Sequence, residues 1–129
     1  MYAFFTISIH VALLGQFDTT TEFMDAVRHV ESRGRCDLVG DGGRAIGPYQ
    51  IHREYWKDSG VPGRWEQCRD RVYAERVMKA YWSRYCPKAL ENRDWQTLAR
   101  VHNGGPDGHR MKQTAAYWQK VRSAANRVQ

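Results

Sequence analysis

The chain contains few cysteines: only Cys36, Cys68 and Cys86 in 129 residues. Small secreted domains commonly carry a dense and even set that forms disulfides. Here at most one bridge can form, and one thiol is left over. We therefore expect a single domain stabilised mainly by a hydrophobic core, for which a chain of this length is large enough.

The patterns that would indicate a metal or nucleotide site are also missing. His52 and His102 are far apart in the sequence and have no ligand spacing with the cysteines, so no structural zinc site is predicted. No glycine-rich phosphate loop stands between a strand pattern and a helix pattern. We expect neither a bound metal nor a cofactor.

Positive charge exceeds negative charge but is not concentrated in runs. Twenty Lys and Arg against 14 Asp and Glu give a formal net charge of +6. This balance favours an anionic partner such as nucleic acid, an acidic membrane surface or a bacterial cell wall. Because the basic residues are scattered, no dedicated tract for binding nucleic acid is predicted.

One apolar run, residues 3–14, stands near the N-terminus. It is too short to span a bilayer as a helix, so no stable membrane insertion is expected. Its length is typical of a secretory signal, with Gly15 at the cleavage boundary, although no Lys or Arg precedes it and His10 interrupts it. We expect residues 1–18 to be a signal peptide or N-terminal extension, and the protein to be secreted. The alternative is a strand or helix packed on the domain.

Among the features that are present, a helix that carries Glu31 is the most informative. Thr19 and Glu22 have the spacing of a capping box, and Gly34 is a suitable left-handed stop. The residues between them form an apolar stripe at helical spacing: Phe23, Ala26, Val27 and Val30. The spacing therefore predicts a helix that begins near Thr19 and ends before Gly34.

Glu31 lies in the last turn of this helix, beside the apolar stripe. Partial desolvation and the negative end of the helix dipole both favour its neutral form. A carboxyl that is protonated near neutral pH is what a general acid requires. The alternative is a solvated glutamate bonded to Arg33 or Arg35.

Asp41 stands in a glycine-rich turn, Gly40 to Gly43, ten residues after Glu31. The glycines allow a tight turn and a close approach to a ligand, and the polar surroundings favour a charged aspartate. One protonated and one ionised carboxyl is the arrangement that glycoside hydrolysis uses. An Asp-Gly hairpin turn without catalytic function is the alternative, and Asp37 is a rival for the second carboxyl.

Further elements follow along the chain. We expect a strand or hairpin arm at 44–51, one or two helical turns at 52–58, a long central helix at 65–85 and helices at 95–101 and 114–126. Val72 is placed on the buried face of the central helix, which Pro87 ends. Asp94 is the expected cap of the helix that starts at Trp95, and the sequence from His102 to Pro106 is expected to break that helix.

A series of motifs resembles the invertebrate-type lysozymes of the destabilase family over roughly residues 20–122. The motifs are Val30-Glu31-Ser32, Asp41-Gly42-Gly43, Gly47-Pro48-Tyr49-Gln50-Ile51, Tyr55-Trp56 with Asp58-Ser59-Gly60, Trp65 and Cys68, Lys79-Ala80-Tyr81 with Arg84-Tyr85, Ala99-Arg100 with His102-Asn103-Gly104-Gly105-Pro106, and Tyr117-Trp118. The chain departs from the family at Ser59, which stands where the usual disulfide partner of Cys68 would be.

The resemblance implies a mainly helical α+β fold of the lysozyme type, in which a small β-hairpin lobe faces a helical lobe across a cleft. Residues 19–129 would form the catalytic domain and hydrolyse the β-1,4 bond between N-acetylmuramic acid and N-acetylglucosamine in the peptidoglycan of the bacterial cell wall. Glu31 would be the proton donor and Asp41 the nucleophile or charged stabiliser. Substrate contacts would come from His52, Arg53, Glu54, Tyr55, Trp56, Lys57, Asp58, Tyr81, His102, Asn103 and Gly104.

Three other functions remain open from the sequence. One is a glycan-binding module without turnover, and another is a cationic antibacterial protein that acts through its charge. The third is an isopeptidase of the kind credited to some members of the family, which needs a serine and a basic partner. Ser32, Ser59 and His102 are present, but no activating base can be assigned to either serine from the sequence.

Overall fold

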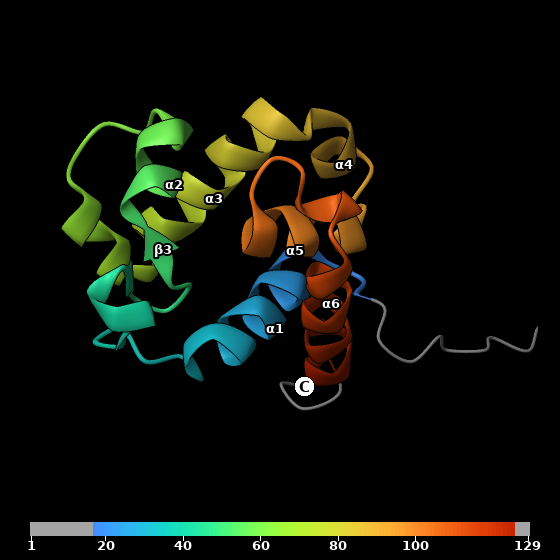
Figure 1. Ribbon diagram of the computed structural model, residues 1–129, viewed down its shortest axis with the longest axis horizontal. Coiled ribbons are helices and arrows are strands. Elements are labelled where there is room, and N and C mark those ends of the chain that lie inside the picture. The colour runs from blue at the N-terminus through green and yellow to red at the C-terminus, as the bar shows by residue number, and fades with distance from the viewer. Residues whose placement is uncertain (1–16, 126–129) are drawn as a thin grey trace, which may run out of the picture.

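Six α-helices and a three-stranded sheet make up residues 17–125, the part of the chain that the computed structural model describes (Figure 1). The α-helices are α1 (Thr20–Ser32), α2 (Arg53–Ser59), α3 (Arg71–Tyr85), α4 (Pro87–Glu91), α5 (Trp95–Gly104) and α6 (Lys112–Ala124). The strands are β1 (Val39–Gly40), β2 (Ala45–Ile46) and β3 (Ile51–His52), and the 3-10 segments are η1 (Asp41–Gly43), η2 (Trp65–Arg69) and η3 (Gly108–Arg110).

The first helix begins and ends close to the predicted residues. The Thr19 hydroxyl accepts a hydrogen bond from the Glu22 amide at 3.1 Å, as a cap should. The Glu22 carboxylate accepts from the Asp18 amide at 2.9 Å, so the return bond of the predicted capping box reaches one residue further back. The left-handed stop is formed by Arg33 (φ 55°), with Gly34 (φ 84°) following it.

The sheet is a small antiparallel one in the order β1-β2-β3. The prediction of one strand or hairpin arm at 44–51 is corrected, because this segment contains β2, a turn and the first residue of β3. Ala45 pairs with His52 and Ile46 with Ile51 across that turn. Gly47 (φ 79°) is the first residue of this turn. It lies so close to the Cys68 carbonyl that no side chain would fit there.

The predicted central helix at 65–85 is in fact two elements. Asp70 has an extended backbone (φ −78°, ψ 128°), which separates η2 from α3. Its carboxylate accepts a hydrogen bond from the Tyr73 amide at 2.8 Å and so caps α3. Val72 therefore falls in an exposed first turn, with 69% of its surface accessible, instead of on the buried face.

The C-terminal helices also differ slightly from their predicted bounds. Pro87 ends α3 as expected and opens α4. Helix α5 is capped by Asp94 but continues past Val101 to Gly104, so the predicted break after Val101 is wrong. His102, Asn103 and Gly104 form its last turn. Helix α6 starts two residues before Thr114, and the predicted end at Asn126 lies outside the described residues.

The core joins the helices to the sheet. Its largest fully buried side chains include Trp82, Tyr49, Phe23, Ile51, Met78 and Leu98. Trp82 of α3 donates from its indole nitrogen to the Leu98 carbonyl of α5 at 3.0 Å. Figure 1 shows the sheet and α2 on one side of the molecule and α1, α5 and α6 on the other. The predicted mainly helical α+β class is confirmed.

Phe17 belongs to the folded body. Its side chain is buried, and its carbonyl accepts a hydrogen bond from the Trp95 indole at 3.0 Å. The predicted signal peptide or N-terminal extension at 1–18 lies outside the described residues except for its last two positions, so that assignment stays a prediction.

All three cysteines are free. Cys36 is exposed, Cys68 is buried and Cys86 is half-buried. Within residues 17–125, no helix is long and apolar enough to cross a bilayer. The described fold is held together by packing and hydrogen bonds among its helices and sheet.

Candidate active site

The structure brings Glu31 and Asp41 to one hollow of about 460 Å³. Glu31 comes from the last turn of α1, and Asp41 from η1, between β1 and β2. The other lining residues are Ala45, Gln50, His52, His102 and Asn103. The two predicted catalytic carboxyls therefore face a common space large enough for part of a saccharide.

Glu31 is half-buried, and its surroundings favour the protonated form. Burial raises the pKa of Glu31 to about 7, while the Tyr117 hydroxyl and the Lys120 charge, both on α6, act in the opposite direction. The groups that act on the pKa of this carboxyl are thus Tyr117 and Lys120, and neither Arg33 nor Arg35 forms an ion pair with it. The direction of the shift is the one that the position beside the apolar stripe of α1 predicted.

Tyr117 has an unusual place beside this carboxyl. Its hydroxyl oxygen is buried and forms no hydrogen bond of regular geometry with any described group. It lies close enough to Glu31 to interact with it, and burial together with the Glu31 charge raises the pKa of Tyr117 well above its ordinary value. The tyrosine hydroxyl therefore remains a donor that Glu31 can use when it loses its proton.

Asp41 lies in the opposite kind of environment. Its side chain is 48% exposed, and its oxygens lie 3.0 Å from Arg44 Nη2 and 3.2 Å from His52 Nε2. Its own backbone is left-handed (φ 50°), as is that of Gly42 (φ 64°). Asp41 is thus exposed to solvent and paired with the Arg44 guanidinium, in contrast to the half-buried Glu31. A protonated Glu31 facing a charged Asp41 is the division of roles that glycoside hydrolysis requires.

His102 forms part of the wall of the hollow and is 8% exposed. Its Nε2 lies 3.2 Å from the Tyr49 carbonyl and its Nδ1 3.1 Å from the Tyr55 hydroxyl. A carbonyl only accepts, so Nε2 carries the proton and Nδ1 accepts from the tyrosine. Burial lowers the pKa of His102 to about 4. The residue is a neutral link between α5, the β2–β3 turn and α2.

Of the other predicted substrate residues, His52 and Asn103 also line this hollow. Arg53 and Glu54 line an adjoining hollow of about 360 Å³ that shares His52 with the first. Trp65, outside the predicted set, forms part of this second hollow, with the Arg53 guanidinium 4.5 Å from its ring centre. The start of α2 is thus next to the hollow of the two carboxyls, and the substrate contacts predicted there stay a prediction.

The aromatic residues among the remaining predicted substrate contacts pack against other side chains of the protein. Tyr55 stacks on Tyr81 with ring centres 3.7 Å apart, and Tyr81 is 3% exposed. The Trp56 indole donates to the Tyr73 hydroxyl at 2.9 Å. These aromatic side chains line neither of the two hollows, so their direct contact with substrate stays a prediction.

Three polar or small positions of the predicted set also have other neighbours. Lys57 forms an exposed ion pair with Glu54 at 3.3 Å, and the Asp58 carbonyl accepts from Arg84 at 2.8 Å. A side chain at Gly104 would meet Thr114, so this glycine allows α5 to pack closely on the segment before α6. Their role in binding likewise stays a prediction.

The sequence interpretation missed four residues near the carboxyls: Ala45, Gln50, Tyr117 and Lys120. The Gln50 amide donates to the Leu38 and Gly47 carbonyls at 3.1 and 2.9 Å, which ties β3 to the loop before β1. Gln50 stands inside the Gly47–Ile51 motif, which was a usable signal. Tyr117 and Lys120 are far from Glu31 in sequence, and no local pattern connects them with it.

The two candidate isopeptidase serines are engaged with backbone. The Ser32 hydroxyl donates to the Pro48 carbonyl at 2.7 Å, and the Ser59 hydroxyl to the Trp56 carbonyl at 2.6 Å. Among the described residues neither hydroxyl has a histidine or lysine as hydrogen-bond partner. The geometry therefore gives no support to an activated serine.

Comparison with known proteins identifies one family. The family model described as Destabilase matches residues 20–124. A lysozyme of Ostrea edulis is 38% identical over 99 residues, which cover 72% of each chain. Lysozyme 1 of Crassostrea virginica and a lysozyme of Magallana gigas are 38% and 39% identical, and the matches span 44% and 58% of their lengths. The chain thus spans about half the length of these two relatives.

Solved structures agree with the sequence matches. The crystal structure of the Tapes japonica lysozyme superposes with a TM-score of 0.67 at 29% identity, over 79% of this chain and 87% of that one. The Meretrix lusoria lysozyme, in complex with PliI of Aeromonas hydrophila, gives the same TM-score and identity over 80% and 88%.

Proposed function

Because the chain belongs to the destabilase family, we propose that it is a lysozyme that hydrolyses the β-1,4 bond between N-acetylmuramic acid and N-acetylglucosamine in peptidoglycan. The observation that carries the proposal is the pair of carboxyls on one hollow, of which Glu31 is half-buried and Asp41 is exposed and paired with nitrogen donors. The relatives and structural neighbours that are named lysozymes support the same activity.

Glu31 is the proposed proton donor. Its pKa of about 7 keeps a large fraction protonated at neutral pH, and that proton is transferred to the leaving glycosidic oxygen. As the carboxylate forms, the Tyr117 hydroxyl and the Lys120 charge stabilise it. The same carboxylate then serves as the base that activates water.

Asp41 is the proposed nucleophile or charged stabiliser. Its carboxylate is held by Arg44 and His52 beside the hollow, where positive charge develops on the sugar ring in the transition state. No metal or cofactor takes part in the proposed reaction. Among residues 17–125, no group of three or more His, Cys, Asp or Glu side chains is placed to hold a metal ion.

The bacterial cell wall is the proposed partner, and the protein is proposed to act outside the cell that makes it. His52, Arg53, Glu54 and Asn103 line the two joined hollows and are the proposed substrate contacts that remain open to solvent. The structural neighbour from Meretrix lusoria is bound to a protein of Aeromonas hydrophila, and the net charge of +6 here suits an anionic bacterial surface.

The test is clearing of a peptidoglycan suspension by wild type and by Glu31→Gln side by side. We expect Glu31→Gln to keep the fold and to lose activity by about 100-fold or more, since a single general acid contributes 10²–10⁴-fold. Undiminished clearing by this variant would remove Glu31 from the mechanism.

Two controls separate this function from the alternatives. A glycan-binding module would retain the polysaccharide in a pull-down but release no reducing ends. If the protein killed bacteria through its charge, the Glu31→Gln variant would kill as well as wild type does. Killing would be lost at high salt, because charge attraction is screened.

A further inference from the structure

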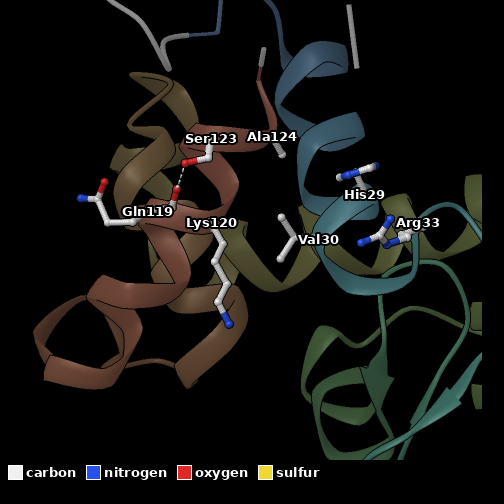
Figure 2. Close-up of a pocket in the computed structure, with 7 residues that line it drawn as sticks. All are labelled: His29, Val30, Arg33, Gln119, Lys120, Ser123 and Ala124. Atoms are coloured by element: carbon white, nitrogen blue, oxygen red, sulfur yellow. Dashed lines mark hydrogen bonds between the residues drawn. The ribbon is translucent and has the colours of Figure 1, made fainter. Parts of the chain in front are cut away.

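A second hollow lies between α1 and α6 and has a volume of about 400 Å³. Its lining residues are His29, Val30, Arg33, Gln119, Lys120, Ser123 and Ala124, none of which lines the hollow of the two carboxyls. Figure 2 shows His29 and Arg33 on α1 and Lys120, Gln119 and Ser123 on α6, with Val30 in the space between the two helices. We call this space the α1–α6 pocket.

The lining of the α1–α6 pocket includes basic side chains and no acidic one. Arg33 and Lys120 are exposed, and neither forms an ion pair within residues 17–125. Asp25 borders the neighbouring hollow, but its carboxylate is already paired with Arg28 at 3.0 Å. Arg33 and Lys120 therefore create a local positive field that suits an anionic ligand.

The α1–α6 pocket is connected to the catalytic carboxyl. A further hollow, lined by Val30, Glu31, Ser32, Arg33, Arg35 and Leu38, shares Val30 and Arg33 with the pocket and Glu31 with the candidate active site. Arg35 adds another exposed cation to this passage. Lys120, in turn, lies in the pocket and also acts on the charge of Glu31. The three hollows are therefore neighbours along α1, with Glu31 and Arg33 among the residues that they share.

We propose that the α1–α6 pocket binds the carboxylates of the peptide stem that is attached to the glycan lying at Glu31. This inference rests on the proposed function and deepens it, because it names the part of the substrate that sets the preference for peptidoglycan over chitin. The stem is linked to the lactyl group of N-acetylmuramic acid, so it leaves the glycan beside the bond that is cleaved. Arg33 can bind a carboxylate through two nitrogens.

The rest of the lining fits a short peptide. Gln119 offers an amide to the peptide groups of the stem, and Val30 and Ala124 offer apolar contacts to its alanine methyl groups. A chitin oligomer has no carboxylate, and the α1–α6 pocket adds nothing to its binding. The pocket therefore favours peptidoglycan over chitin.

The decisive variant is Arg33→Gln, with Arg76→Gln as its matched control. Arg76 is an exposed arginine of α3 and lines none of the hollows described here, so both variants lose one positive charge and only one changes the α1–α6 pocket. Arg33 is exposed and forms no ion pair with any described residue, so the fold is expected to remain intact, which thermal unfolding checks.

Two substrates are compared: peptidoglycan freed of teichoic acid, and the same material after its carboxylates are converted to carboxamides. Arg33→Gln should lower kcat/KM on the acidic substrate by about threefold to tenfold, mainly through KM, as the loss of one partly exposed ionic contact implies. On the amidated substrate Arg33→Gln and wild type should be equal. Arg76→Gln should match wild type on both.

The proposal is overturned if Arg33→Gln lowers activity equally on both substrates, or on neither. It is also overturned if the loss appears only on walls that retain teichoic acid, because the pocket would then bind phosphate. If wild type hydrolyses neither substrate, the proposed function fails, and binding of N-acetylmuramyl-L-alanyl-D-glutamate measured by calorimetry decides the inference separately. Weaker binding to Arg33→Gln than to Arg76→Gln supports it, and equal binding refutes it.

Discussion

At the scale of single residues, the chemistry of Glu31 depends on two side chains of a different helix. Burial raises its pKa, and the Tyr117 hydroxyl and Lys120 hold that rise to about 7. A carboxyl desolvated without these partners would be a weaker acid and would hold its proton too tightly for transfer near neutral pH. Tyr117 is therefore a positioning residue, and its effect should appear in the pH dependence of the rate.

We expect Tyr117→Phe to shift the high-pH limb of the activity profile to higher pH. The hydroxyl lowers the pKa of Glu31, so its removal raises that pKa and keeps the acid protonated further into the alkaline range. The measurement is kcat/KM for peptidoglycan across pH 5 to 9. Tyr85→Phe, a half-buried tyrosine that packs on Tyr81, is the control. A limb that stays in place would contradict the role given to Tyr117.

The second carboxyl can be assigned by comparing two aspartates. Asp41 lines the hollow and contacts Arg44 and His52, whereas Asp37 is exposed and does not line it. Asp41→Asn should lower peptidoglycan hydrolysis by about 100-fold or more, and Asp37→Asn should leave it within about twofold, because only the charge beside the reacting sugar stabilises the transition state. The reverse ranking would transfer the role to Asp37.

At the scale of elements, the turn between β2 and β3 aligns much of the site. Gly47 opens this turn, the Gln50 amide donates to the Gly47 and Leu38 carbonyls, and the Tyr49 carbonyl accepts a hydrogen bond from His102 Nε2. The Tyr49 hydroxyl donates to Glu75 of α3 at 2.6 Å, which connects the sheet to the central helix. Small displacements of this turn would therefore be transmitted to several walls of the hollow.

Gly47→Ala should destabilise the protein more than Gly60→Ala. Both glycines are left-handed, at φ 79° and 70°, so either substitution costs about 1–2 kcal/mol in backbone strain. Only at Gly47 would the new methyl group meet the Cys68 backbone, while Gly60 has open space. Chemical denaturation should show an added loss on the order of 1–3 kcal/mol at Gly47, as for other overpacked sites. Equal losses would show that the Cys68 contact is unimportant.

At the scale of the whole molecule, two buried groups make folding depend on pH in opposite directions. Glu31 has a raised pKa, from 4.5 to about 7, so the folded state binds a proton more tightly than the unfolded state and loses stability as pH rises between these values. His102 has a lowered pKa, from 6.5 to about 4, so the folded state loses stability as pH falls between these values. The two effects oppose each other between pH 4.5 and 6.5.

Removing either group should therefore reveal how the other group makes the unfolding free energy depend on pH. Relative to Glu31→Gln, wild type should lose up to about 3 kcal/mol of unfolding free energy as pH rises from 4.5 to 7, since one pKa unit corresponds to about 1.4 kcal/mol. Relative to His102→Gln, wild type should lose a similar amount as pH falls from 6.5 to 4. Denaturation at several pH values measures both differences. Differences that do not change with pH would contradict the assigned pKa values.

The sequence by itself determined the features that depend on neighbouring residues. The Thr19 and Asp94 caps, the end of α3 before Pro87 and the glycine-rich turn around Asp41 all lie where local patterns predicted them. Each follows from backbone hydrogen bonding and allowed φ angles within a few residues. The desolvation of Glu31 was also readable, because its helix stripe must be buried against something.

Only the tertiary structure decided which distant residues meet. Nothing in the local pattern around Glu31 indicates that α6 supplies Tyr117 and Lys120. Tyr81 is buried against Tyr55 and Val72 is exposed, although the two share one helix. Burial, pKa shifts and the basic α1–α6 pocket arise from contacts between elements far apart in the chain, and those contacts form when the core packs.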